Sequence, residues 1–112
     1  MKRILLLLFS LTAVLCSAAP KVDFQSSDKT LVERLLTSQT SLRGKTMGET
    51  VLHFARALKG IPYVGGTLDK ATEERLVVNL RALDCTTYVE TVLALALCSR
   101  NGETSFDDYC RH

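Results

Sequence analysis

The sequence lacks the features that identify several large classes of protein. It has no internal repeat, no low-complexity segment and no internal linker rich in proline and glycine. Its formal net charge is only +2, and two of its positive charges lie at positions 2 and 3. No basic surface for a nucleic acid is therefore indicated. Its 112 residues suffice for one small domain.

Two common signatures of ligand sites are also missing. No Cys-x-x-Cys pair and no Cys/His spacing indicates a zinc site. The glycine pair Gly65-Gly66 is not followed by the Gly-Lys-Ser/Thr of a phosphate-binding loop. We therefore expect no metal, no cofactor and no nucleic-acid partner.

The N-terminus has the pattern of a secretory signal peptide. Two basic residues precede an apolar run that ends near Leu15, and small residues occupy positions 16–19. The run is too short for a permanent membrane span. We expect a signal peptide over 1–18 and an exported, periplasmic protein. Lipid attachment at Cys16 is the alternative, which the bulky Leu15 disfavours because a small residue is expected there.

Three cysteines follow residue 18, namely Cys85, Cys98 and Cys110. An odd number in an exported protein leaves at least one thiol unpaired within the chain. One possibility is a Cys98–Cys110 disulfide with Cys85 free. In the other, Cys98 is a plain core residue.

The hydrophobic pattern predicts a mostly helical chain with one short strand. The predicted elements are a helix over 28–40, a helix from Thr46 to Gly60, a buried strand over 75–80 and a helix over 85–99. Thr46 and Glu49 form a capping box at the start of the second helix. Asp84 is expected to cap the last helix.

Two predictions concern helix faces. The last helix is expected to bury a face formed by Val89, Val92, Leu93 and Ala96, with Cys85 pointing inward at its first turn. His53 lies opposite the apolar stripe of its own helix, and we predict a solvated surface histidine.

The position of Cys85 suggests a nucleophile. The reactive form of cysteine is the thiolate, and the partial positive charge of a helix N-terminus favours that anion. Exposed N–H groups at the same end can stabilise an oxyanion. The negative charge of Asp84 disfavours the Cys85 thiolate unless the Asp84 carboxylate is hydrogen-bonded to the backbone. A buried core cysteine is the competing interpretation.

Three motifs in one order resemble the NlpC-type cysteine peptidases and amidases of bacterial cell walls. They are Gly60-Ile61-Pro62-Tyr63, Gly65-Gly66 and Asp84-Cys85-Thr86. The stretches YVGGTLD, LVVNLRALDCTTYVETVLALAL and SFDDYC resemble one branch more closely, the N-acetylmuramoyl-L-alanine amidase-like proteins exported by Gram-negative bacteria. The resemblance extends from about Thr46 onward. It implies an α+β, papain-like fold, of which residues 19–112 form mainly the helical N-terminal lobe.

The resemblance also implies roles for individual residues. Cys85 would be the nucleophile, and Tyr63 would line the pocket and form a hydrogen bond near the reacting centre. Asp84 would bind the peptide part of the substrate or hold the turn. Gly65 and Gly66 would let the backbone approach the substrate. The implied reaction is metal-free hydrolysis of the amide between N-acetylmuramic acid and L-alanine in peptidoglycan fragments.

One departure from the family pattern concerns the general base. The family's base is a histidine after the cysteine, on the strand-rich half of the fold, whereas the only later histidine here is His112. Ser105-x-x-Asp108 predicts the start of another helix. We therefore expect a truncated chain that lacks the β half and is inactive alone.

Two other functions fit the same residues. One is a small exported helical binding or scaffold module in which Cys85 is a core residue. The other is a γ-glutamyl peptidase of the papain-like plan that cuts further along the stem peptide. The reactivity of the Cys85 thiol tests the first, and analysis of the products tests the second.

Overall fold

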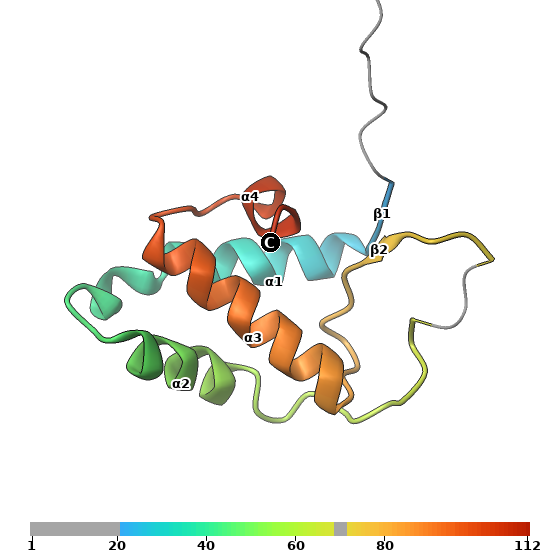
Figure 1. Ribbon diagram of the computed structural model, residues 1–112, viewed down its shortest axis with the longest axis horizontal. Coiled ribbons are helices and arrows are strands. Elements are labelled where there is room, and N and C mark those ends of the chain that lie inside the picture. Colours follow the sequence, from blue (N-terminus) through green and yellow to red (C-terminus); the bar gives the residue numbers. More distant parts are fainter. Residues whose placement is uncertain (1–20, 69–71) are drawn as a thin grey trace, which may run out of the picture.

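The computed structural model describes residues 21–68 and 72–112, so the predicted signal peptide and Cys16 lie outside the described residues (Figure 1). The described part is mostly helical and has one two-stranded sheet, which is compatible with the predicted α+β class. Its elements in order are β1 (Val22–Asp23), α1 (Ser26–Thr37), the 3-10 helix η1 (Gln39–Leu42), α2 (Met47–Ala57), β2 (Leu76–Val77), α3 (Cys85–Arg100) and α4 (Phe106–Cys110).

Local signals in the sequence set the start and the end of α2. The Thr46 hydroxyl accepts the N–H of Glu49 at 3.2 Å, and the Glu49 carboxylate accepts the N–H of Thr46 at 3.2 Å, which confirms the predicted capping box. Gly60 has φ +99°, a conformation that other residues rarely adopt, and it turns the chain away after α2. The first predicted helix is also present, but it begins at Ser26 and ends at Thr37.

Helix α3 lies across α1 and α2 and also contacts α4 (Figure 1). The Tyr88 hydroxyl in the first turn of α3 donates to the Ala55 carbonyl of α2 at 2.6 Å. The core between these elements is formed by Val32, Leu36, Phe54, Leu58, Val78, Leu80, Leu83, Val92, Leu95, Ala96, Cys98, Phe106 and Tyr109. Burial of these apolar side chains is the main stabilisation of the packed helices.

The sheet is smaller than the sequence suggested. Strand β2 covers only Leu76–Val77 and pairs in parallel with β1. Leu76 is exposed, and the buried residues of this segment, Val78 and Leu80, follow the strand. The prediction of a buried strand over 75–80 was therefore wrong in its extent, because the chain leaves the sheet and enters the helical core after Val77.

The prediction of the buried face of α3 was correct for two of its four residues and wrong for the other two. Val92 and Ala96 are buried, but Val89 is 52% and Leu93 is 44% exposed, and Cys85 is exposed as well. The buried side also includes Thr91, Leu95 and Cys98. The helix carries apolar residues on almost every side, so its sequence alone does not specify which side packs inward. Contacts with α1, α2 and α4 make that choice.

Within residues 21–68 and 72–112, no helix combines the length and the apolar character needed to cross a membrane.

Candidate active site

The start of α3 presents Cys85 to solvent. Asp84 is the N-cap residue: its Oδ1 accepts the Thr87 N–H at 2.8 Å, and the Thr87 hydroxyl accepts the Asp84 N–H at 2.9 Å. The predicted cap is confirmed. Cys85 follows as the first residue of the helix and its side chain is exposed. This exposure contradicts the expected inward orientation and the interpretation of Cys85 as a core cysteine.

The Asp84 carboxylate forms hydrogen bonds with the first turn of α3. Hydrogen bonds from the Thr87 backbone and then from the Thr87 side chain lower the pKa of Asp84, so it is ionised at neutral pH. Its charge interacts with the N–H groups that begin α3. Asp84 therefore holds the turn that positions Cys85.

A second segment of the chain lies directly beside this turn. The Leu83 N–H donates to the Pro62 carbonyl at 3.0 Å, and the Val64 N–H donates to the Leu83 carbonyl at 3.1 Å. These bonds form an isolated parallel bridge between Tyr63 and Leu83. The two predicted motifs, far apart in sequence, are thus joined by their backbones close to Cys85.

The side chains of this segment are available at the surface. Tyr63 is 73% exposed, so its ring is not packed into the core. Gly66 has φ +74°, and a Cβ added at Gly65 would meet nothing within 4 Å. The loop therefore leaves open space beside the Tyr63–Leu83 bridge, where a ligand can approach the backbone.

Two polar residues that the sequence analysis missed position the segment before α3. The buried Asp28 carboxylate accepts the Leu80 N–H at 3.0 Å, and the Asn79 Oδ1 accepts the Arg81 N–H at 2.9 Å. Asp28 is an acidic residue in the first turn of a helix, and this local pattern can be recognised in the sequence. No local pattern identifies its partner, because that contact spans 52 positions.

A cavity of about 350 Å³ lies next to α3, but it is not the surface around Cys85. Its wall on α3 comprises Thr87, Glu90, Thr91 and Ala94. The other lining residues are Thr67, Leu68, Leu76, Val77, Val78, Asn79, Tyr109, Cys110 and His112. At about 100° per residue the four side chains on α3 face away from Cys85. Neither Tyr63 nor Cys85 lines the cavity. In the described part of the chain, the candidate nucleophile is on an open surface.

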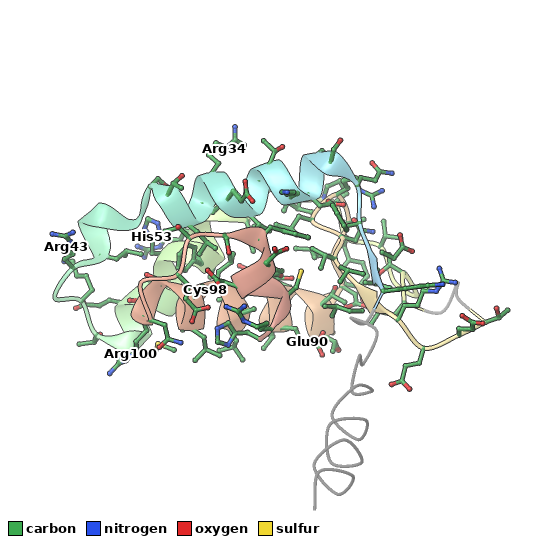
Figure 2. All side chains as sticks on the ribbon, turned by 90° about the horizontal axis from the view of Figure 1, so that it is seen from above. Arg34, Arg43, His53, Glu90, Cys98 and Arg100 are labelled. Carbon is green, nitrogen blue, oxygen red and sulfur yellow. The ribbon has the colours of Figure 1, made fainter. Side chains whose placement is uncertain are left out.

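In the described part of the chain, neither histidine is hydrogen-bonded to Cys85. His53 is half-buried and lines a surface pocket with Ser41, Lys45, Glu49 and Arg56, so the prediction of a surface residue is only partly correct. Figure 2 shows His53 in the half of the molecule that holds Arg43 and Arg100, whereas Glu90 near the start of α3 lies toward the other end.

His112 lies near the other end of α3. Its Nε2 is 3.2 Å from Glu103 Oε1, and a ring nitrogen lies within 4.8 Å of the Cys98 sulfur. Cys98 lies about 20 Å further along α3 than Cys85. Within residues 21–68 and 72–112, no histidine therefore forms a hydrogen bond with the exposed Cys85 thiol.

The three cysteines of the described part are all free thiols. Cys98 is fully buried, and Cys110 is partly buried. Burial raises the pKa of Cys98 to about 11 and also raises that of Cys110. The Cys98–Cys110 disulfide considered above is not formed, and Cys98 is a core residue. Cys85 is the most exposed of these three described cysteines.

Comparison with known proteins gives one match. The model of a family described as AmiA-like, N-acetylmuramoyl-L-alanine amidase-like, matches residues 53–112, more than half of the chain. The matched part includes Tyr63, the glycine pair, Asp84 and Cys85. Neither the curated proteins nor the solved structures gave a match.

Proposed function

The chain belongs to the N-acetylmuramoyl-L-alanine amidase-like family, and from that premise we propose that it contributes the nucleophile of a cysteine amidase. The substrate is a peptidoglycan fragment, and the bond cleaved is the amide between N-acetylmuramic acid and L-alanine. The observation that most supports this proposal is the joining of the Pro62–Val64 segment to the turn before Cys85. This junction joins the backbone of the loop that carries Tyr63, Gly65 and Gly66 to Leu83, two residues before the exposed Cys85.

The proposed reaction has two chemical steps. The Cys85 sulfur attacks the carbonyl carbon of the muramic acid lactyl group, and the bond to the L-alanine nitrogen breaks as that nitrogen takes a proton. Water then attacks the thioester, which releases the muramic carboxylate and restores the thiol. Splitting a difficult hydrolysis into these two steps is the usual advantage of a covalent nucleophile.

The start of α3 supports both steps. The N–H of Cys85 occupies the first position of the helix and has no acceptor within it. In this proposal that N–H stabilises the oxyanion formed at the carbonyl. Asp84 keeps the turn closed by binding Thr87. Truncation of Asp84 would therefore move the nucleophile as well as shorten the helix.

The neighbouring loop provides the substrate contacts in this proposal. The Tyr63 hydroxyl is free to form a hydrogen bond near the reacting carbonyl, because the side chain is largely exposed. Gly65 and Gly66 allow the substrate backbone to lie close to the loop. Asp84 can bind the peptide part of the substrate only with lone pairs that Thr87 does not use.

The general base comes from outside the described residues in this proposal. An acyl transfer to cysteine needs a proton acceptor within about 3 Å and a later donor to the leaving amine. His53 lies in its own surface pocket and His112 lies beside Glu103, and in this proposal neither is the base. The described helices form the N-terminal lobe of a papain-like, NlpC-type fold whose β half supplies the base. Residues 1–18 direct the protein to the periplasm.

Hydrolysis of N-acetylmuramoyl-L-alanyl peptides by the natural full-length protein tests the proposal. We expect a product with L-alanine as its new N-terminus and no turnover in Cys85→Ala. Cys110→Ser is the matched control, and it should retain activity. Turnover in Cys85→Ala would refute the nucleophile role. A cut within the stem peptide would instead support the γ-glutamyl peptidase.

The same assay on isolated residues 19–112 tests the assignment of the base. We expect no turnover, because no imidazole reaches the thiol. Turnover that disappears in His53→Ala, with an unchanged circular dichroism spectrum, would show that His53 is the base and that this part of the proposal is wrong.

A further inference from the structure

Three side chains with metal-binding atoms converge where α3 ends and α4 returns. The Cys98 sulfur, a Glu103 carboxylate oxygen and a His112 ring nitrogen all lie within 4.8 Å of one another. The spacing of these residues matches no common zinc motif, and the sequence did not indicate a site here. The cluster is assembled by the chain reversal between α3 and α4 (Figure 1).

The geometry of this cluster is pre-organised by the backbone. The Glu103 N–H donates to the Cys98 carbonyl at 2.9 Å, and the His112 N–H donates to the Tyr109 carbonyl at 3.2 Å. The His112 Nε2 lies 3.2 and 3.3 Å from the two Glu103 oxygens. Ligand atoms around a tetrahedral zinc ion are about 3.3–3.8 Å apart. The nitrogen–oxygen separation already has this size, and the sulfur lies within 4.8 Å of both atoms.

The surroundings of the three groups are also informative. Cys98 is fully buried, and its thiol has no hydrogen-bond partner among residues 21–68 and 72–112. The Glu103 and His112 side chains are 21% and 22% exposed, which gives a solvated ion a route to the sulfur. Arg111 approaches Glu103 at 4.0 Å, but its nearer partner is Asp108. The positive charge of Arg111 is therefore largely compensated.

We propose that Cys98, Glu103 and His112 bind one zinc-class divalent cation. One sulfur, one imidazole nitrogen and one carboxylate oxygen form a ligand set that suits zinc. Coordination releases the Cys98 proton to solvent. The thiolate and the carboxylate then neutralise the two charges of the ion, and water completes the tetrahedron.

The proposed ion would fasten the C-terminal end of α4 to the C-terminal end of α3. It is separate from the amidase site, because Cys98 and Cys85 are about 20 Å apart along α3. Figure 2 shows Cys98 well separated from Glu90, which lies near the start of that helix. The inference is therefore independent of the proposed function.

Titration of the reduced, metal-free natural protein with Co²⁺, followed by Zn²⁺, tests the site. We expect one equivalent of Co²⁺ to produce a thiolate-to-metal charge-transfer band, which Zn²⁺ abolishes by displacement. Zn²⁺ should also raise the Tm, because it binds only the folded state. Glu103→Gln and His112→Gln should each weaken binding by about tenfold or more. The matched controls Glu90→Gln, His53→Gln and Cys110→Ser should bind like the unaltered protein.

Cys98→Ser should remove the charge-transfer band. Because Cys98 is a core residue, that variant can fail to fold, and the two surface variants then decide the question. The proposal is overturned if no band appears, if the band is lost in Cys110→Ser, or if Glu103→Gln and His112→Gln bind as tightly as the unaltered protein.

Discussion

The carboxylate of Asp28, in the first turn of α1, accepts a hydrogen bond from the backbone N–H of Leu80 at 3.0 Å, across 52 positions of sequence. The same carboxylate accepts the Gln25 N–H at 2.9 Å and approaches the Arg81 Nε at 3.4 Å. Asp28 is 1% exposed, so its charge is buried but fully partnered. One side chain thus joins the start of α1 to the segment that leads into α3.

Asp28→Ala should destabilise the protein. The substitution leaves the buried Leu80 N–H without an acceptor, which costs about 1–3 kcal/mol of the free energy of unfolding. Denaturant unfolding measures the loss. Asp23→Ala is the control, because Asp23 is exposed and its side chain makes no hydrogen bond in the described part. Equal losses in the two variants would contradict the assigned role.

The cap at Asp84 should make stability depend on acid pH. Hydrogen bonds from Thr87 lower the pKa of Asp84 in the folded state below the value of about 3.9 expected when unfolded. Its contribution is thus complete above that unfolded value and is lost as pH falls through the folded pKa. Asp84→Ala should lower the Tm at pH 7, and the difference should shrink below about pH 4.

Asp84→Asn is the informative companion variant for this cap. Asparagine accepts the same backbone N–H, so it should retain most of the Tm at pH 7. Having no carboxylate, it should show a weaker loss of stability in acid than the unaltered protein. A Tm difference for Asp84→Ala that stays constant from neutral to acid pH would show that the ionised carboxylate is not the cause.

The three thiols should differ in reactivity. Cys85 is exposed, whereas burial raises the pKa of Cys98 to about 11 and that of Cys110 above its ordinary value. Iodoacetamide at neutral pH should therefore modify Cys85 first, as followed by peptide mass spectrometry. In denaturant the three rates should converge, which serves as the control. Modification of Cys98 at the rate of Cys85 in the folded protein would show that the helical layer opens readily.

The outer face of α3 should make isolated residues 19–112 prone to associate. Val89, Leu93 and Leu97 are 52%, 44% and 40% exposed and recur every fourth residue along the helix. Adjacent apolar side chains of this kind favour self-association. Leu93→Gln combined with Leu97→Gln should reduce both dye binding and the sedimentation coefficient at high concentration. Leu68→Gln, at an exposed position outside the helices, is the control and should have little effect.

Local chemistry determined the parts of this protein that the sequence predicted correctly. Thr46 with Glu49 and Asp84 before Cys85 specify helix starts through bonds within one turn, so the sequence is sufficient to find them. The predicted end of the second helix at Gly60 was three residues too late, because α2 ends at Ala57 and Leu58 is its C-cap. The motifs that indicated a cysteine amidase are also local, and the family match covers them.

Tertiary structure alone decided which side of α3 is buried. Apolar residues surround that helix, so its sequence is compatible with several buried faces, and contact with α1, α2 and α4 selects one. The selected face leaves Cys85 and Leu93 outside.

Contacts between distant segments were also decided only by the fold. The bond from Asp28 to Leu80, the bridge between Tyr63 and Leu83 and the cluster of Cys98 with His112 join residues whose separation leaves no periodic or local signal. Each becomes favourable only after the helices have packed, because burial and chain reversal bring the partners together.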